Sequence, residues 1–581
     1  MHLKKLLMSI ALVAAAAIWA HGGERILIWP EGKMPMVQDH QIAAMTDEAG
    51  KKDFKKDEHR VAYIEWFDPP AEQVKNGACI IMISGGSYQN CCDIGFVRNN
   101  AKKLTEMGAT VVNFVYRTPR PQGAPIYKSA WIDGQRAVRM VRKEAAKRGF
   151  DPERIGVMSM SAGSHLATLL ATSSQTPAYE PVDELDKTVP CHINWACAFA
   201  IAYGVDDNTG GCNTRDGDAI DVKLDKAFKF DKKTCPMWMG HGGNDPYSPG
   251  SSTAVYRQLR RMKIPAELHL YPDRGHGVHG FDRAVEFMRQ MGYFGKLDPE
   301  VELMKRYASD DDRAECIRMP VWGEGRKPPS FQQKQNLPYI EWHIPKTLTT
   351  KAIQIIYSGG AYVGNSPDGF EVAPARRYLN AKGMTVVTLC YRSPRPEGLA
   401  KHTTAWQDLQ RTIKLVRSEA EKRGLDPNRI GIMGSSAGGH LTLMGCTSSK
   451  RRAYWPTDSI DWKNSCEVQW GIAIYPAYAL TDGLDQPNKE GGNEDNSRLA
   501  REFSFDLKTP PMLFIHGDAD GWAAMNSVKC WEQLRRMGIQ GQLHTLAKRY
   551  HCFQSKAAPG TGSYTWLDRI WEFMSHKGYN K

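Results

Sequence analysis

Residues 154–163 read RIGVMSMSAG, and residues 429–438 read RIGIMGSSAG. In each stretch an apolar run of strand length leads into a turn of small residues, and a helical pattern follows. The second stretch holds the full G-x-S-x-G pattern of a nucleophile elbow, in which a sharp turn between a strand and a helix presents a serine. We therefore identify Ser161 and Ser436 as candidate nucleophiles. Ser159 stands where the first stretch would have its first glycine, and serine is small enough for that position.

The two stretches belong to a repeat that covers most of the chain. The segment 116–121 (YRTPRP) recurs as 391–396 (YRSPRP), at the same offset of 275 residues that separates the two elbows. A constant offset over several motifs indicates a domain duplication. We expect a first domain over 21–296, a charged linker over 297–313 and a second domain over 314–581.

Each half alternates strand patterns with helical patterns. In the first half, apolar runs of strand length occupy 78–83, 110–116, 155–158, 196–202 and 236–240. Between them, apolar residues such as Trp131, Val138 and Val141 are spaced three and four apart or in multiples of this spacing, as in an amphipathic helix. This alternation predicts an α/β fold in which a mostly parallel sheet is flanked by helices.

A serine nucleophile needs a base, and the base needs a group that orients it. In both halves an aspartate follows the candidate serine by 84 residues, and a histidine follows that aspartate by 31 residues. The order serine, acid, histidine is the one expected after a nucleophile elbow. The predicted triads are Ser161, Asp245 and His276 in the first half, and Ser436, Asp520 and His551 in the second.

Other histidines compete for the role of base. His279 lies close to His276, but Gln554 stands at the corresponding position of the second half, so His276 is favoured. His165 and His440 follow the elbows on the helix, where we expect them to pack or to cap.

Other acids and thiols also recur between the halves. Asp207 and Asp482 follow an earlier strand and remain the alternative acids. Cys191 and Cys466 correspond as well, but no histidine stands in a suitable context, so we interpret them as buried thiols.

A tetrahedral intermediate needs hydrogen-bond donors for its negative oxygen. Glycine-rich loops follow the first strong strand of each half, and the residue after the nucleophile supplies a further backbone N–H. The predicted oxyanion-hole residues are Gly86, Ser87 and Ala162 in the first half, and Gly360, Ala361 and Ala437 in the second.

The order of these motifs resembles that of bacterial acetyl-xylan-esterase-like α/β-hydrolases, relatives of the hormone-sensitive-lipase-type esterases. The resemblance rests on Ser-Gly-Gly-Ser/Ala-Tyr, Tyr-Arg-x-Pro-Arg-Pro, the helix of Asp133 or Asp408, Asp-Pro-x-Arg-Ile-Gly, Ser-Ala-Gly-x-His-Leu, His-Gly-x-x-Asp and the late histidine. It implies two tandem α/β-hydrolase domains and deacetylation of plant or algal polysaccharides. Both halves depart from the family at the third glycine of the oxyanion loop, where they have Ser87 and Ala361.

The first twenty residues are typical of a secretory signal peptide. Lys4 and Lys5 precede an apolar run over 6–18, and Ala20 offers a small residue for cleavage. The run is short for a membrane span, and no other stretch of the sequence suits one. We therefore expect export to the periplasm or the extracellular space, with no membrane anchor.

Composition excludes several other classes. Hydrophobic residues at 41% and charged residues at 24% are ordinary globular values. The net charge of +12 is moderate for 581 residues, and no cluster of Lys and Arg is dense enough to indicate nucleic-acid binding. Thirteen cysteines, an odd number, fit no metal motif. Export would permit disulfides, although the sequence does not pair them.

These patterns together predict a secreted serine esterase that acts on an acylated polysaccharide or oligosaccharide and requires no metal or organic cofactor. An exopeptidase with the same triad order is an alternative, disfavoured because no propeller or other gating domain is present. A second alternative makes one half an idle binding module, and two complete triads argue against it. The halves differ most at 51–60 and after His551, where the second half has eleven additional residues before its last helix.

Overall fold

The computed structural model describes residues 23–38, 61–92, 94–206, 222–294, 309–481, 498–555 and 565–581. Some predictions fall outside these ranges: the signal peptide over 1–20, the charged stretch over 51–60, most of the linker over 297–313, and both alternative acids, Asp207 and Asp482.

Contacts within the chain divide it into two compact units. Unit 1 is Met1–Ala266 with Asp273–Lys296, and unit 2 is Glu267–Pro272 with Leu297–Lys581. The elements up to β10 follow the chain in this order: β1 (Glu24–Leu27), β2 (Tyr63–Phe67), β3 (Cys79–Ile83), η1 (Ile94–Arg98), α4 (Asn99–Glu106), β4 (Thr110–Val115), α5 (Lys128–Lys143), α6 (Ala145–Arg148), β5 (Ile155–Met160), α7 (Ala162–Thr172), α8 (Glu184–Thr188), β6 (Trp195–Phe199), β7 (Val205–Asp206), β8 (Lys223–Leu224), β9 (Met237–Gly242), α9 (Gly250–Arg261) and β10 (Ala266–Tyr271), with α10 (Phe281–Gln290) after them.

The remaining elements repeat this series from β12 onward. They are β11 (Arg313–Pro320), β12 (Tyr339–Pro345), β13 (Ile353–Tyr357), α12 (Ala373–Ala381), β14 (Thr385–Cys390), α13 (Thr403–Ala420), η2 (Glu421–Arg423), β15 (Ile430–Ser435), α14 (Ala437–Thr447), α15 (Ser459–Lys463), β16 (Trp470–Ile474), β17 (Leu480–Thr481), β18 (Arg498–Leu499), β19 (Met512–Gly517), α16 (Met525–Arg536), β20 (Gly541–Leu546), η4 (Phe553–Ser555) and α17 (Thr565–His576).

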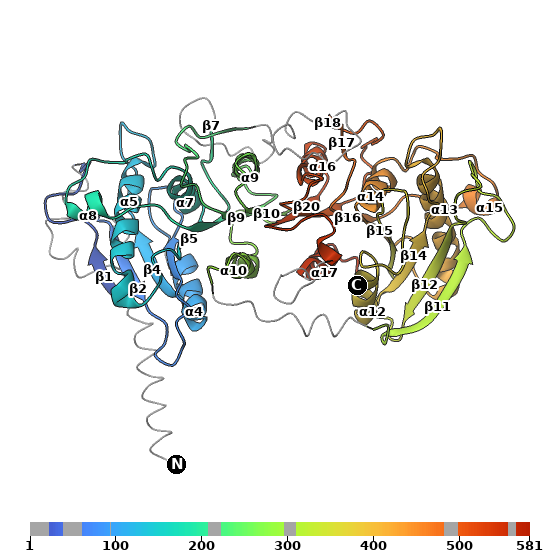
Figure 1. Cartoon of the computed structure of the whole chain (residues 1–581), viewed down its shortest axis with the longest axis horizontal. Helices are drawn as coiled ribbons and strands as arrows, with labels where there is room; N and C mark the ends of the chain where they lie inside the picture. The colour runs from blue at the N-terminus through green and yellow to red at the C-terminus, as the bar shows by residue number, and fades with distance from the viewer. Residues whose placement is uncertain are drawn as a thin grey trace, which may run out of the picture. The chain divides into compact units, whose positions relative to one another are not determined.

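Each unit contains a sheet of the same topology. In unit 1, β3 pairs in parallel with β4 and β5, and the parallel series continues through β6 to β9. In unit 2, β13, β14, β15, β16, β19 and β20 repeat the parallel part. One side of each sheet ends in antiparallel strands, β2 and β1 in unit 1 and β12 and β11 in unit 2. These sheets and their helices confirm the predicted α/β fold (Figure 1).

The predicted strands of the first half agree with β3, β4, β5, β6 and β9 to within a few residues. The largest difference lies at β6, which was expected over 196–202 but ends at Phe199. Ala200 takes a φ of 50°, outside the extended region, so the strand cannot continue through it.

The helix after each elbow lies in the core of its unit. All eleven residues of α7 and all eleven of α14 are buried. Apart from one histidine in each, His165 and His440, their residues are apolar or small on every side, as a helix that is covered all round requires. This burial fixes the start of each helix, and with it the candidate serine that precedes it.

A buried ion pair anchors the loop after β4 to helix α5. Arg117 and Asp133 are both fully buried, with Arg117 Nη2 at 2.8 Å from Asp133 Oδ1, and the Trp29 indole N–H donates to the same carboxylate at 2.7 Å. Unit 2 repeats the arrangement with Arg392, Asp408 and Trp322. Removing one partner of such a pair would leave an uncompensated buried charge, which is strongly destabilising. The ion pair therefore holds the loop after the strand against the helix in both units.

The corresponding cysteines of the two halves, Cys191 and Cys466, are buried, as the sequence predicts. Burial raises the pKa of both thiols, so they are poor nucleophiles. Nine of the twelve cysteines that the structure places are buried. None of the described helices combines the length and apolar composition that a membrane span needs.

Candidate active sites

The candidate serines sit at strained turns between a strand and a helix. Ser161, between β5 and α7, has φ 60° and ψ −126°, and Ser436, between β15 and α14, has φ 56° and ψ −120°. A positive φ is costly for a residue other than glycine and persists only where surrounding contacts impose it. Both serines therefore have the strained backbone that the elbow pattern predicts.

Small neighbours make the turn sterically possible. A Cβ on Gly163 would lie 2.5 Å from the carbonyl oxygens of Ile83 and Ser84, too close for any side chain. Ser159, which stands in place of the elbow's first glycine, is accommodated by hydrogen bonds of its Oγ to Ser164 Oγ at 3.1 Å and to the Cys197 carbonyl at 3.3 Å.

In unit 1 the chain brings the three predicted side chains together. The Ser161 hydroxyl donates to His276 Nε2 at 2.8 Å. On its other side, His276 Nδ1 lies 2.9 Å from Asp245 Oδ2 and 3.0 Å from Oδ1. Because a carboxylate only accepts, Nδ1 carries the proton and Nε2 is free to take one from the serine.

Unit 2 repeats the geometry with its own residues. The Ser436 hydroxyl donates to His551 Nε2 at 2.8 Å, and His551 Nδ1 donates to Asp520 Oδ2 at 2.8 Å. The three elements that supply these residues, β15, β19 and the segment after β20, correspond to those that supply the unit 1 residues.

A second histidine lies against each acid. His241 Nε2 is 3.3 Å from Asp245 Oδ2, and His516 Nε2 is 3.2 Å from Asp520 Oδ2. Burial alone would raise the pKa of both aspartates, but hydrogen bonding with the two histidines beside each one lowers it below its ordinary value. Both acids are therefore anionic at neutral pH and able to stabilise an imidazolium.

The glycine-rich loops pass directly over the serines. A Cβ on Gly85 would lie 2.7 Å from Ser161 Cβ, and one on Gly359 would lie 2.6 Å from Ser436 Cβ. Of the predicted oxyanion residues, Gly86 and Gly360 have positive φ angles of 128° and 82°.

Ser87 and Ala361 stand where related esterases have a third glycine, and both keep a backbone conformation that glycine favours. Ser87 has a φ of 56° and Ala361 a φ of 54°, both in the left-handed region. Ala162 and Ala437 are the first residues of α7 and α14, where a backbone N–H has no acceptor within the helix. Each loop therefore lies beside a serine, with the helix N-terminus next to it.

Sequence reasoning missed the supports of these loops. Tyr88, next to Ser87, donates to His165 Nδ1 at 2.8 Å, and His165 Nε2 donates to Asp225 at 3.0 Å. His165 is fully buried and packs, as expected, and it also joins the oxyanion loop to a carboxylate.

Unit 2 has the same series of hydrogen bonds, from a tyrosine through a histidine to an acid, but the acid is a glutamate. Tyr362 donates to His440 Nδ1 at 2.8 Å, and His440 Nε2 lies 3.1 Å from Glu502 Oε1. The tyrosines and histidines recur at fixed spacing and could have been paired from sequence. The acids could not, because Asp225 and Glu502 do not occupy corresponding positions.

Unit 2 also places a buried carboxylate on its oxyanion loop. Glu371 Oε2 accepts the Gly359 N–H at 2.6 Å, and Glu371 Oε1 accepts the Tyr475 hydroxyl at 3.0 Å. Tyr475 also contacts Gln554, three residues after His551. Burial raises the pKa of Glu371. These hydrogen bonds join the oxyanion loop to the segment that carries His551.

The rival histidine of unit 1 stays outside the triad. His279 Nε2 bonds to the carbonyl of Gly275 at 2.8 Å, and it contacts neither Ser161 nor Asp245 by hydrogen bond in the described residues. Its counterpart Gln554 lies in the Glu371 network instead.

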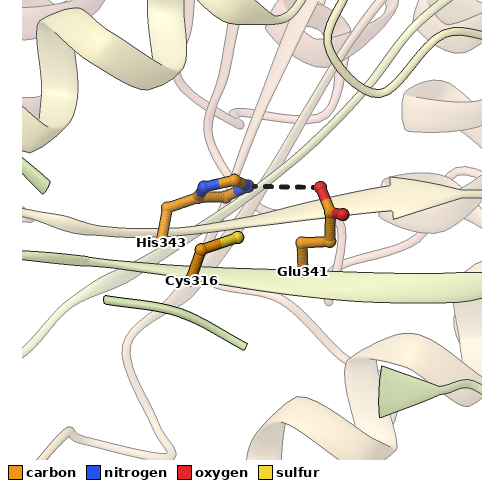
Figure 2. Close-up of side chains that lie close together, drawn as sticks. All are labelled: Cys316, Glu341 and His343. Atoms are coloured by element: carbon orange, nitrogen blue, oxygen red, sulfur yellow. Dashed lines mark ion pairs between the residues drawn. The ribbon is translucent and has the colours of Figure 1, made fainter. Parts of the chain in front are cut away.

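Two clusters of potential metal ligands occur in the described part of unit 2, and their hydrogen bonds oppose metal binding. In the first, Cys316, Glu341 and His343 lie together on β11 and β12 (Figure 2). His343 Nδ1 accepts from Arg313 at 3.0 Å and from Arg376 at 3.1 Å, so its proton lies on Nε2, the nitrogen that faces Glu341. Burial and these arginines lower the pKa of His343 to about 3.

The second cluster is His402, His440 and Glu502. Tyr362 and Glu502 already occupy both ring nitrogens of His440. Burial and the neighbouring His440 lower the pKa of His402 to about 4. The second cluster therefore supports the oxyanion loop rather than presenting a free ligand nitrogen of His440.

Comparison with known proteins finds the duplication again. A family model described as BD-FAE matches residues 67–209 and 341–533, together more than half of the chain. The first match includes Ser161, and the second includes Ser436 and Asp520.

Individual relatives match only parts of the chain. An acetylxylan esterase from Xylanibacter ruminicola is 31% identical over 220 residues, which are 36% of this chain and 42% of the relative. The endo-1,4-beta-xylanase B of Butyrivibrio fibrisolvens is 26% identical over 210 residues, 34% of this chain and 32% of the relative. The chain thus spans less than half the length of these two curated relatives.

Among solved structures, the acetyl ester-xyloside bifunctional hydrolase of Caldicellulosiruptor lactoaceticus is 23% identical, with a TM-score of 0.36 over 45% of this chain and 97% of that one. The resemblance to acetyl-xylan-esterase-like α/β-hydrolases, stated from the motifs, is confirmed by the family match in two separate regions. The chain is a tandem α/β-hydrolase that belongs to the BD-FAE family.

Proposed function

We propose that the chain is a secreted serine carboxylesterase with two active sites, which removes acetyl or other short acyl groups from carbohydrate esters. The observation that carries the proposal is the pair of serine–histidine contacts, each 2.8 Å, at strained elbows. The names of the relatives, an acetylxylan esterase and a xylanase among them, support the choice of substrate. The signal-peptide pattern of residues 1–20 supports export.

The first half-reaction forms an acyl-enzyme. Ser161 Oγ attacks the acyl carbonyl carbon while His276 Nε2 takes the hydroxyl proton, and Asp245 stabilises the imidazolium. The N–H groups of Gly86, Ser87 and Ala162 are the donors that we assign to the oxyanion. The carbon–oxygen bond to the sugar then breaks, and His276 gives its proton to the departing sugar hydroxyl.

The second half-reaction releases the acid. His276 removes a proton from water, the hydroxide attacks the acyl carbonyl, and the tetrahedral intermediate collapses with return of the proton to Ser161 Oγ. Ser436, His551 and Asp520 perform the same steps in unit 2, with Gly360, Ala361 and Ala437 as donors. The strained serine is held ready before the substrate arrives, so no rearrangement of the turn is needed.

The experiment that tests this function measures acid release from acetylated xylan and from p-nitrophenyl acetate. Wild-type protein and both single variants, Ser161→Ala and Ser436→Ala, should release acetate. The double variant should release it at the background rate. Equal release by the double variant and the wild type would contradict the assignment of both nucleophiles.

A further inference from the structure

Unit 1 contains a cavity that the proposed triad does not use. It has a volume of about 350 Å³, and its lining includes Tyr127, Trp131, Thr176, Asp206, Asp225 and Lys226. A volume of this size lies at the lower end of the range for small-molecule sites, which typically combine an apolar wall with a few polar groups.

The wall of the cavity continues into the support of the oxyanion loop. Asp225 lines the cavity and accepts a hydrogen bond from His165, the residue that holds Tyr88. Tyr127, the residue before helix α5, has its ring centroid 5.2 Å from that of His165. A ligand in this cavity would therefore contact the layer directly beneath the oxyanion loop.

Comparison of the two units shows what keeps the cavity open. Gln135 donates to the carbonyl of Thr176 at 2.8 Å, and the corresponding Gln410 donates to the carbonyl of Arg451 at 2.7 Å, so these two positions are equivalent. The Arg451 guanidinium lies 5.3 Å from the centroid of Trp406, the counterpart of Trp131. At the lining position itself, unit 1 thus has the short Thr176 where unit 2 has the long Arg451. The two indoles are equally buried, and in unit 1 the Lys128 ammonium lies 5.2 Å from the centroid of Trp131.

At a second lining position, unit 1 again has a shorter side chain than unit 2. Ser173 donates to the carbonyl of Ala227 at 2.9 Å, and the corresponding Ser448 donates to the carbonyl of Glu502 at 3.1 Å. Ala227 lines the cavity. Where unit 1 has a threonine and an alanine, unit 2 therefore has an arginine and a glutamate, and the Arg451 guanidinium donates to the carbonyl of Glu502 at 2.6 Å.

The lining indicates the chemistry of the ligand. The half-buried Tyr127 offers aromatic surface, against which the C–H face of a sugar ring can pack, and the buried Trp131 forms part of the wall. Asp206 and Lys226 form an ion pair of 3.1 Å at the cavity, and the other charged lining residues are one acid and one lysine, Asp225 and Lys229, so a neutral ring is favoured over an anionic one. The indole N–H of Trp131, a residue only 6% exposed, has no acceptor within the described residues, and the same holds for its counterpart Trp406, so this N–H does not distinguish the two units.

We propose that this cavity binds a neutral sugar ring of the acylated glycan, and that unit 1 thereby holds the polysaccharide while unit 2 does not hold it in this way. The inference rests on the proposed function, because it takes its ligand from the substrate of the triads. It places Trp131, which the sequence indicated to be a helix-core residue, in the wall of a ligand cavity.

The test fills the cavity with the side chain that unit 2 uses. In the Ser436→Ala background, where only unit 1 turns over, Thr176→Arg is compared with the matched control Thr176→Ser. For acetylated xylo-oligosaccharides, KM should rise about tenfold in Thr176→Arg with kcat nearly unchanged, the pattern of a lost contact that is equal in ground state and transition state. For p-nitrophenyl acetate, which has no sugar, both variants should match the parent. Ala227→Glu provides a second filling variant if Thr176→Arg does not fold.

A binding measurement separates failure of the cavity from failure of the esterase. Calorimetry with unacetylated xylohexaose is performed on the Ser161→Ala, Ser436→Ala protein with and without Thr176→Arg. Weaker binding by the filled protein supports the cavity even if no ester is hydrolysed. Equal binding, or an oligosaccharide KM that does not change, overturns the proposal. Loss of p-nitrophenyl acetate hydrolysis in the unfilled Ser436→Ala protein would instead contradict the proposed function of unit 1.

Discussion

The backbone N–H of Gly359 donates a hydrogen bond of 2.6 Å to the buried carboxylate of Glu371. A Cβ on Gly359 would lie 2.6 Å from Ser436 Cβ, so this bond holds the glycine-rich loop close beside the candidate nucleophile of unit 2. In the described part of unit 1, no carboxylate accepts from Gly85, the counterpart of Gly359. The two units therefore hold equivalent loops by different means.

Glu371→Ala should lower the activity of unit 2 and leave that of unit 1 intact. The change leaves the Gly359 N–H and the Tyr475 hydroxyl without their acceptor, and an unsatisfied buried donor costs about 1–3 kcal/mol. Measured in the Ser161→Ala background, kcat for p-nitrophenyl acetate should fall roughly tenfold or more, since each factor of ten is about 1.4 kcal/mol. Glu371→Gln retains an oxygen acceptor and should recover most of the loss.

The matched control is Glu371→Ala in the Ser436→Ala background, where only unit 1 turns over. Its kcat should equal that of the parent. A KM increase with unchanged kcat in unit 2 would show that Glu371 acts on substrate binding and would contradict a role in holding the oxyanion loop.

The stability of the wild type relative to Glu371→Gln should depend on pH. Burial raises the pKa of Glu371 in the folded protein, so its contribution to stability is fully present below the unfolded pKa, about 4.3, and is lost as pH rises through the folded value. The melting temperature of the wild type minus that of Glu371→Gln should therefore be larger near pH 4 than near pH 8. Calorimetric scans of both proteins at several pH values check this. A difference in melting temperature that increases with pH would contradict a raised pKa of Glu371.

An activity-based probe should find two reactive serines. A fluorophosphonate reacts with a serine that a neighbouring histidine activates, and both serines have that neighbour at 2.8 Å. Mass spectrometry of labelled wild type should detect adducts on Ser161 and Ser436, and each single alanine variant should lose one. A wild type labelled at a single serine would leave the other unit as a binding module.

His276→Ala and His279→Ala should differ by orders of magnitude in unit 1. His276 bridges Ser161 and Asp245, and removing one member of a triad costs on the order of 10⁴–10⁶ in kcat. His279 bonds to the carbonyl of Gly275 and is not a member of the triad, so its alanine variant should keep most of the activity. Both are measured in the Ser436→Ala background with p-nitrophenyl acetate, and a comparable loss in the two variants would contradict the choice of base.

The sequence alone predicts the parts of the site that depend on spacing. The elbow, the acid and the histidine each occur twice at fixed intervals, and the repeat itself separates His276 from His279. The supports of the oxyanion loops were beyond such reasoning. Asp225 and Glu502 reach equivalent histidines from different chain positions, and Glu371 becomes informative only once its helix is seen to lie against Gly359.

The two units should prefer different ester substrates, because the residue beside each catalytic histidine differs. Tyr247 and Trp522 occupy the same position: each donates its backbone N–H to the triad aspartate at 2.8 Å. Their rings lie beside the histidines, at 5.0 Å from His276 for Tyr247 and at 6.4 Å from His551 for Trp522.

The departing sugar oxygen must lie close to the triad histidine to receive its proton. The indole of Trp522 is larger than the ring of Tyr247, so unit 2 should accept a narrower range of leaving groups. The Ser161→Ala and Ser436→Ala proteins should therefore rank a panel of aryl esters and acetylated oligosaccharides differently by kcat/KM. Exchanging the two aromatics, with Tyr247→Trp in unit 1 and Trp522→Tyr in unit 2, should shift each ranking toward that of the other unit. If both units give one ranking before the exchange, the tandem arrangement acts through avidity alone, because a second identical site near a bound polymer raises only the effective concentration.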